Sequence, residues 1–238
     1  MKRNLTNKIR FILDEFIPPI IRDSKWFMWP LYVIAYRKLS VHNLMNYKAS
    51  AYSMSKEEYA QFYLSLGNSI SRHRMTDLNQ ASINYLVGCL PKIPGLSVLD
   101  VGSGNGYLLE ILNSLNRWIR VAGIDVVPMD KKIIGISEVY EGALPDLPFD
   151  DKEFDVVTCT HVIEHVVDVA ASVKELIRVT KKMIIIVVPR QRYYNYTLDE
   201  HLNFYYNIEP IVFYFSKYSI VYSLQDGDWV LIVDLEKT

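Results

Sequence analysis

The chain of 238 residues has only two cysteines, no long apolar run and almost no net charge. Cys89 and Cys159 lie far apart and form neither a metal-binding pattern nor a disulfide framework. This cysteine usage excludes a disulfide-stapled extracellular scaffold. We therefore expect a protein of the reducing cytoplasm.

No uncharged stretch reaches the roughly 20 apolar residues that cross a bilayer. Asp14 and Glu15 also interrupt the beginning of the chain before a signal-peptide core can form. The longest early uncharged run is WFMWPLYVIAY, residues 26–36, whose aromatic residues between Lys25 and Arg37 suit a membrane interface or a greasy substrate. Packing of this arm on its own domain, or on a second subunit, is the alternative. The sequence thus leaves open both a peripheral membrane contact through the N-terminus and a homodimer.

The net charge of −1 hides an asymmetry along the chain. Up to residue 48, nine basic residues stand against three acidic ones, so the beginning is basic and the remainder acidic. The basic residues are Lys2, Arg3, Lys8, Arg10, Arg22, Lys25, Arg37, Lys38 and Lys48. The later part of the chain has no clear basic stripe, and we expect no nucleic-acid partner.

Residues 1–94 show no convincing β-alternation, and we expect a helical N-terminal extension or cap over this range. Prolines at positions 18, 19 and 30 are expected to break it. The predicted helices cover residues 8–16, 31–46, 57–66 and 77–90.

From residue 95 to 238, apolar strands alternate with helices, which predicts an α/β domain. We expect a Rossmann-like, doubly wound, mostly parallel sheet of seven strands that ends in an antiparallel hairpin. In the looser region before Tyr140 a helix is short or missing. The predicted strands cover residues 97–101, 120–125, 138–140, 154–160, 183–188, 220–224 and 229–233. Right-handed crossovers place the ligand-binding loops at the carboxyl ends of the strands.

The stretch VLDVGSGNGY, residues 98–107, is a strand followed by a glycine loop and a helix start. It lacks the Lys-Ser/Thr pair of a P-loop. Tyr107 stands where the dinucleotide fingerprint has its third glycine, which argues against NAD and FAD. Asp100 would repel a pyrophosphate and attract an ammonium or sulfonium group.

The segment DVGSGNG, residues 100–106, resembles the first motif of class I S-adenosylmethionine-dependent methyltransferases of the small-molecule type. The resemblance implies that the loop surrounds the methionine part of the cofactor, whose product is S-adenosylhomocysteine. The implied loop residues are Asp100, Gly102, Ser103, Gly104 and Gly106. It also implies that Asp125, with Val126 beside it, binds the ribose hydroxyls at the end of the second strand.

Residues 141–155 resemble the family segment that leads into the fourth strand, where an acid usually contacts the adenine amine. Here Ala143 replaces that acid. We expect backbone groups of Ala143 and Leu144 to bind adenine, with Asp146 as a substitute acid.

The segment THVIEHVVD, residues 160–168, contains V-I-E-H, which resembles the L-E-H form common in the family. The resemblance implies that His161 lies beside the cofactor and His165 on the substrate side. An unperturbed imidazole titrates near pH 6.5, so His165 is a candidate general base. A structural role is the alternative.

A metal is a further alternative for this segment, although we assign no metal ligand. His161, Glu164 and His165 are spaced so that one helical turn would present all three to a divalent ion. The segment also resembles the E-x-x-E-H signature of metal-assisted quinone-ring O-methyltransferases, with His161 replacing the first Glu.

The segment from 189 to 204 follows the fifth strand, where this family often binds its acceptor. Four residues are candidate substrate ligands: Arg190, Arg192, Tyr193 and Tyr194. His201 is a second catalytic candidate. Packing of these rings beneath the final helix is the alternative.

These observations predict a methyltransferase that uses S-adenosylmethionine to modify a small-molecule, lipid-linked or sugar-linked acceptor, with O-methylation preferred over N-methylation. The missing acid at Ala143 motivates one alternative, a non-catalytic binding or scaffold protein that keeps the cofactor fold. Tyr107 argues against a third hypothesis, an NAD-linked oxidoreductase.

Overall fold

A computed structural model describes residues 11–36, 41–65, 76–127 and 137–237 of the protein. Its centre is a seven-stranded sheet in the order β3-β2-β1-β4-β5-β7-β6. Six strands share one direction, and β7 runs antiparallel to both of its neighbours. The strands are β1 (Leu96–Val101), β2 (Trp118–Asp125), β3 (Glu138–Glu141), β4 (Phe154–Thr160), β5 (Thr180–Pro189), β6 (Ser219–Gln225) and β7 (Asp228–Asp234). The predicted fold class is confirmed.

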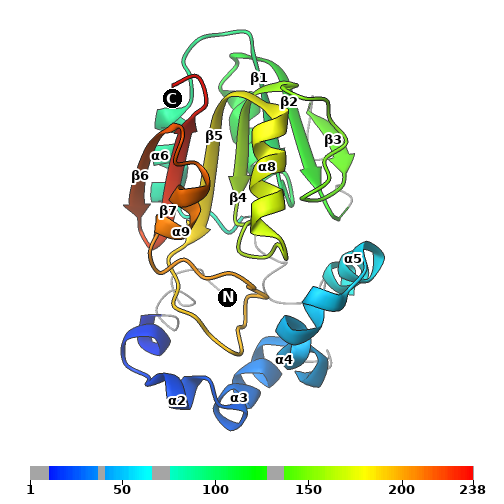
Figure 1. Cartoon of the computed structure of the whole chain (residues 1–238), viewed down its shortest axis with the longest axis vertical. Coiled ribbons are helices and arrows are strands. Elements are labelled where there is room, and N and C mark those ends of the chain that lie inside the picture. Colours follow the sequence, from blue (N-terminus) through cyan, green and yellow to red (C-terminus); the bar gives the residue numbers. More distant parts are fainter. Residues whose placement is uncertain (1–10, 37–40, 66–75, 128–136, 238) are drawn as a thin grey trace.

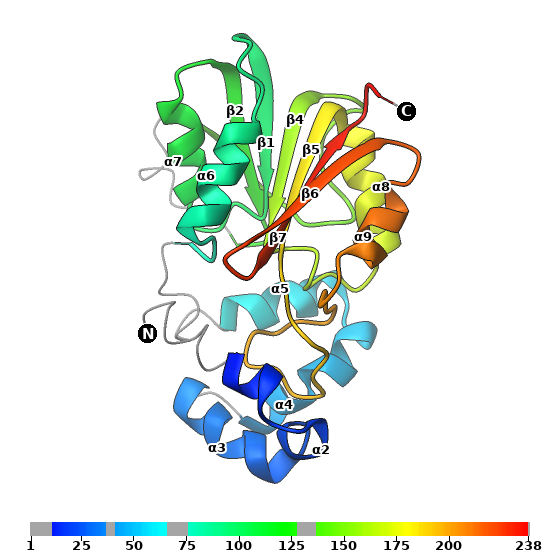
Figure 2. The same cartoon turned by 90° about the vertical axis from the view of Figure 1, so that its left-hand side faces the viewer.

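Helices cover both faces of the sheet (Figure 2). On one face lie α6 (Gln80–Cys89) and α7 (Tyr107–Ser114), and on the other α8 (Val169–Val179) and α9 (Glu209–Tyr214). Successive side chains of a strand point to opposite faces, so Ile184 joins the α8 side while Ile185 joins the α6 side. Both side chains are fully buried, as expected for a central strand covered on both faces.

The predicted C-terminal hairpin is confirmed, and its turn explains its register. Asp226 and Gly227 join β6 to β7 with φ values of 47° and 89°. Two positive φ values in a two-residue connection are typical of a type I′ turn, whose twist matches that of the flanking strands.

The predicted helical N-terminus is also present, and residues 11–65 are called the arm below. Beyond a first helical stretch at residues 11–15, it contains α2 (Pro19–Arg22), α3 (Lys25–Tyr36), α4 (Val41–Ser50), the 3₁₀ turn η1 (Ala51–Ser53) and α5 (Lys56–Ser65). The arm lies beyond the carboxyl ends of the parallel strands (Figure 1). It has a small core of its own, formed by Met28, Tyr32, Tyr36, Leu44 and Met45 against Tyr196 and Leu198.

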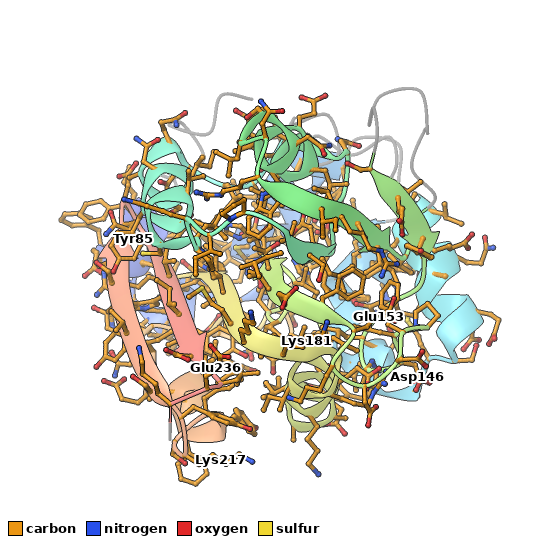
Figure 3. The ribbon with its side chains drawn as sticks, turned by 90° about the horizontal axis from the view of Figure 1, so that it is seen from above. Tyr85, Asp146, Glu153, Lys181, Lys217 and Glu236 are labelled. Carbon is orange, nitrogen blue, oxygen red and sulfur yellow. The ribbon has the colours of Figure 1, made fainter. Side chains whose placement is uncertain are left out.

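Figure 3 looks onto the opposite end of the sheet, where the chain enters β4 and β5 and leaves β7. Charged side chains such as Glu153, Lys181 and Glu236 lie there. The two ends of the molecule therefore differ: one is polar, and the other is covered by the arm.

The expectation that Pro30 breaks the helix is wrong, because Pro30 lies inside α3. An interior proline costs about 3 kcal/mol, since it removes a backbone hydrogen bond and its ring clashes with the preceding turn. Met28, Tyr32 and Tyr36 are buried from the same helix. Burial of large apolar side chains is worth about 1.5–3 kcal/mol each, which outweighs that cost.

The predictions for the region before Tyr140 and for the domain boundary at residue 94 remain predictions. The short or missing helix before Tyr140 falls on residues 128–136, outside the described part of the chain. The boundary at residue 94 stays a prediction, although α6, which it would assign to the extension, packs with the sheet core.

Candidate active site

A cavity of about 290 Å³ opens where the carboxyl ends of β1, β2 and β4 meet the arm. Most predicted site residues line it, namely Asp100, Gly102, Ser103, Gly104, Asp125, Val126, Ala143, Leu144, His161, His165 and His201. Gly106 does not line it; it caps the N-terminus of α7, and its backbone N–H donates to the Ser103 carbonyl at 2.8 Å.

The glycine loop needs its glycines for two physical reasons. Gly102, Gly104 and Gly106 have φ values of 74°, 52° and 80°, a region that favours glycine. At Gly102 there is also no room, because a Cβ atom would lie 2.1 Å from Cγ2 of Val162. The segment after β4 therefore packs directly against the loop after β1, and this contact closes one wall of the cavity.

Asp100 ends β1 with its side chain almost fully buried, at 1% exposure. Its Oδ1 accepts a hydrogen bond of 2.7 Å from the Thr158 hydroxyl on β4. Burial raises the pKa of Asp100 to about 7, with the Thr158 hydrogen bond acting in the opposite direction. Near neutral pH this carboxyl is thus balanced between its two forms, and a nearby cation would favour the charged one.

Asp125 at the end of β2 fastens the glycine loop to its neighbour strand. Its Oδ2 accepts from the Gly104 backbone N–H at 2.8 Å, and its Oδ1 accepts from the Val127 N–H at 2.9 Å. Each carboxylate oxygen has a second lone pair for a further donor. Asp125 can therefore receive two hydroxyl groups while it holds the loop.

The segment at Ala143 forms a tight turn beside Asp125. The Gly142 N–H donates to the Asp125 carbonyl at 3.0 Å, and the Asp146 N–H donates to the Ala143 carbonyl at 3.1 Å. Ala143 and Leu144 line the cavity, whereas Asp146 is exposed and does not. The expectation that Asp146 substitutes for the missing acid gains no support from this placement.

His161 has a left-handed backbone, with φ of 56°, and lies between two buried acids. Its Nδ1 is 3.1 Å from Oε1 of Glu164, and its Nε2 is 3.4 Å from Oδ2 of Asp228. Burial alone would lower the pKa of His161, but the charges and hydrogen bonds of Asp228 and Glu164 raise it to about 10. His161 is therefore an imidazolium at neutral pH, with no lone pair for a metal or a proton.

The predicted helical turn at this segment is wrong. Residues 161–168 form a bend and a short turn rather than a helix, because the left-handed conformation at His161 interrupts it. His161, Glu164 and His165 therefore do not present three ligands to one ion.

The structure instead joins Glu164 and His165 to His201 from a distant segment. A carboxylate oxygen of Glu164 and a ring nitrogen of each histidine lie within 4.8 Å of one another. Glu164 is fully buried, and the two imidazole centroids are 4.8 Å apart. This trio has the donor atoms of a divalent-metal site.

The neighbours of the two histidines indicate their tautomers. His165 Nδ1 is 3.2 Å from the Glu200 carbonyl oxygen, which only accepts, so Nδ1 carries the hydrogen. His201 Nδ1 is 2.5 Å from Oε1 of Gln191, which accepts in the same way. Nε2 of His165 is then the ring nitrogen that can accept a proton.

Two tyrosines of α5, which the sequence analysis does not predict, close the cavity from the arm. Tyr59 donates its hydroxyl hydrogen to the His165 carbonyl at 3.2 Å, and the Tyr63 ring lies edge-on to the His165 ring at 6.2 Å. Both line the cavity. Helix 57–66 is predicted, but no motif within it indicates which of its side chains reach the site.

The four predicted substrate ligands do not line the cavity. Arg190 and Arg192 stack on the Tyr206 ring at 4.1 and 4.2 Å. Tyr193 lies under the Lys48 ammonium at 4.0 Å. Tyr194 is buried, and its hydroxyl donates to Asp14 at 2.5 Å. Arg192, Tyr193 and Tyr194 attach the segment after β5 to the arm, and Arg190 packs on Tyr206, so a substrate role is not supported by their positions.

Residues 99–188 match the methyltransferase domain family. Over these residues the chain is similar to methyltransferase domains. The order of its strands, the glycine loop after β1 and the acid after β2 agree with this assignment.

Relatives and solved structures of methyltransferases resemble this chain over part of its length. It is 32% identical over 117 residues to a ubiquinone biosynthesis O-methyltransferase of Alkalilimnicola ehrlichii, covering 44% of this chain and 45% of that protein. It is 27% identical over 140 residues to a ubiquinone/menaquinone biosynthesis C-methyltransferase of Idiomarina loihiensis, covering 53% and 55%. The chain thus spans about half the length of the curated relatives it matches.

A crystal structure of an S-adenosylmethionine-dependent methyltransferase from Aquifex aeolicus has a TM-score of 0.51 to this chain at 17% identity. The match covers 74% of this chain and 98% of that one. At this identity the likeness shows the fold of the methyltransferase domain.

Proposed function

We propose that the protein is a methyltransferase that binds S-adenosylmethionine and O-methylates a small-molecule acceptor, free or linked to a lipid or sugar. One observation carries the proposal: a single cavity has Asp100, the glycine loop and Asp125 on one side and His165 with His201 on the other. The relatives named ubiquinone biosynthesis O-methyltransferase support O-methylation of a small-molecule acceptor.

The residues on the first side fit the cofactor. When bound, S-adenosylmethionine supplies a methyl group from its sulfonium to an acceptor oxygen by in-line displacement. The Asp100 carboxyl favours a positive neighbour once it loses its proton, and Asp125 accepts hydrogen bonds from a pair of hydroxyls. Adenine would contact backbone groups of Ala143 and Leu144, beside Asp125. Gly102 leaves the loop in contact with Val162, so the cavity wall there is tight.

The residues on the second side fit an acceptor that must lose a proton. His165 Nε2 takes the hydroxyl proton as the new O–C bond forms, and its Nδ1–H stays on the Glu200 carbonyl. Tyr59 and Tyr63 cover this side, which keeps bulk water from competing with the acceptor.

Labelled methyl transfer tests the proposal. The protein is incubated with methyl-labelled S-adenosylmethionine and either catechol-type phenols or an organic-solvent extract of cells. We expect label in an O-methylated product, and none when His165 is replaced by alanine. Binding of S-adenosylhomocysteine without transfer to any acceptor would favour the non-catalytic scaffold, which the missing acid at Ala143 suggests.

A metal-assisted reaction is a second candidate, which the Glu164, His165 and His201 trio favours. A divalent ion held there would lower the pKa of an acceptor hydroxyl and orient it. Chelation followed by readdition of Mg²⁺, Mn²⁺ or Zn²⁺ separates the two candidates. Transfer that resists chelation supports His165 as a base, and transfer that returns only with a metal and fails in His201→Ala supports the trio.

A cytoplasmic location, contact with a membrane surface and a homodimer are part of the same proposal. Cys89 and Cys159 are free thiols, which supports a reducing cytoplasm. Within the described residues, no helix has both the length and the apolar character that crossing a membrane requires. Exposed apolar side chains of the arm support attachment to a membrane surface, or a homodimer through the same face.

A further inference from the structure

The outer face of α3 is apolar although it is exposed. Trp26, Trp29 and Ile34 are 72%, 55% and 69% exposed. With Pro30, also exposed, they occupy positions i, i+3, i+4 and i+8 of the helix and therefore share one side. The opposite side of the helix is buried in the core of the arm, through Met28, Tyr32 and Tyr36.

The neighbouring part of the arm extends this apolar surface. Phe16 and Ile20 are 69% and 85% exposed. The α2 and α3 helices form the end of the molecule farthest from the sheet (Figures 1 and 2). We call Phe16, Ile20, Trp26, Trp29 and Ile34 the outer apolar face. The other two tryptophans, Trp118 and Trp229, lie in the domain and are not exposed.

The three acids that precede residue 48 are engaged within the molecule. All of them contact the segment after β5. Asp14 accepts from the Tyr194 hydroxyl, Glu15 is 3.4 Å from Arg192, and Asp23 accepts from the Asn195 N–H at 2.9 Å.

Up to residue 48 the sequence has nine basic residues against these three acids. Lys25 is exposed directly beside Trp26. The sequence adds Lys2, Arg3, Lys8, Arg10, Arg37 and Lys38 to the same part of the chain. An apolar, tryptophan-bearing surface with excess positive charge is complementary to anionic lipid, because tryptophan prefers the headgroup level and basic residues are attracted to the lipid charge.

We propose that the outer apolar face docks the protein on the surface of an anionic membrane. This goes beyond the proposed methyl transfer and does not depend on it. It also gives that reaction a source of acceptor, since the arm that carries the face contributes Tyr59 and Tyr63 to the cavity. A lipid-linked acceptor would then reach the site from the side of the bilayer.

Vesicle co-sedimentation of the full chain tests the proposal. Vesicles of phosphatidylcholine alone are compared with vesicles that also contain phosphatidylglycerol. The test variant is Trp26→Gln with Trp29→Gln, which keeps residues suited to a helix. A matched control is Phe213→Gln with Val221→Gln, which removes two exposed apolar side chains (77% and 57% exposed) from the domain.

We expect the wild-type chain and the control to pellet with the anionic vesicles, less so at high salt, and the test variant to bind about tenfold more weakly or less. Tryptophan fluorescence of the wild type should shift to shorter wavelength on binding. Failure of the wild type to pellet, or unchanged binding of the test variant, would overturn the proposal. A dimer in light scattering that the test variant abolishes, with no vesicle binding, would assign the face to a second copy of the chain.

S-adenosylhomocysteine titration of the same samples keeps the two proposals apart. Unchanged affinity for S-adenosylhomocysteine in the test variant shows that it is folded. Any loss of vesicle binding then comes from the outer apolar face and not from unfolding. Absence of affinity in the wild type would count against the proposed cofactor and leave the vesicle result standing.

Discussion

The two sides of the cavity are built in different ways. The proposed cofactor side comes from the ends of two adjacent parallel strands, with Asp100, the glycine loop and Asp125 within a short stretch of chain. The proposed acceptor side joins α5, the turn after β4 and the segment after β5, which are far apart in sequence. The first is determined by local backbone geometry, and the second by how the arm packs.

Replacement of His165 is expected to have the largest effect and to separate the two sides of the cavity. His165→Ala should reduce the rate of methyl transfer about 10²- to 10⁴-fold, because a general base is lost. The affinity for S-adenosylhomocysteine should stay unchanged, since the imidazole lies on the acceptor side. Rates come from labelled transfer and affinities from calorimetry. His42→Ala, an exposed histidine of α4, is the control. Equal losses in rate and cofactor affinity would contradict the division into two sides.

The next effect should appear at Gly102. Gly102→Ala combines a strained backbone with a clash against Val162, and we expect S-adenosylhomocysteine to bind about 100-fold more weakly. Gly95→Ala is a matched control, because Gly95 has φ of 82° but no atom within 4 Å of an added Cβ. The control should lose stability without losing affinity. If both variants bind equally well, the fit between the loop and Val162 is irrelevant to the cofactor.

The role of Asp125 predicts a smaller loss. Asp125→Asn keeps the shape but removes the charge that accepts from Gly104 and Val127 and, in our proposal, from the ribose. Hydrogen bonds to a charged group are worth about 1.5–3 kcal/mol, so we expect about a 10- to 100-fold loss of S-adenosylhomocysteine affinity by calorimetry. Asp151→Asn, at an exposed carboxylate paired with Arg178, should change nothing. An unchanged affinity in Asp125→Asn would show that Asp125 does not bind the ribose.

The last prediction is a pH dependence of the free energy of unfolding that arises from Asp100. Its folded pKa of about 7 lies above the unfolded value of about 3.9, so the folded chain holds the proton more strongly. The stabilisation is complete below pH 4 and is lost as the pH rises towards 7. Asp100→Asn should remove this slope. Denaturant unfolding of both proteins at pH 5 and pH 8 measures it.

At pH 8 the asparagine variant should gain stability relative to the wild type, compared with pH 5. An identical pH dependence in the two proteins would show that burial does not raise the pKa of Asp100. His161, whose pKa is raised on folding, adds its own pH dependence equally to both proteins, so the comparison between them isolates Asp100.

The contrast between the two sides also explains what could be predicted from the sequence. The mostly parallel sheet, its terminal hairpin and the glycine loop after β1 follow from alternation and glycine spacing, which are local signals. Ala143, Leu144 and His161 line the cavity, and their contact with the cofactor stays a prediction. The raised pKa of His161 depends on Asp228, a residue of β7 that no local pattern connects to it.

The acceptor side was less predictable because its contacts are long-range. Arg192 and Tyr194 have the chemistry of ligands but attach the segment after β5 to the arm. Tyr59 and Tyr63 have no motif, yet they line the cavity. Only the packing of α5 against the turn at His165 identifies them.

Isothermal titration of the protein with S-adenosylhomocysteine, and separately with NAD, tests the central claim most directly. We expect saturable binding of S-adenosylhomocysteine at one site per chain and no binding of NAD, because Tyr107 and Asp100 disfavour a pyrophosphate in the loop. Absence of S-adenosylhomocysteine binding, or binding of NAD in its place, would show that the loop does not hold this cofactor.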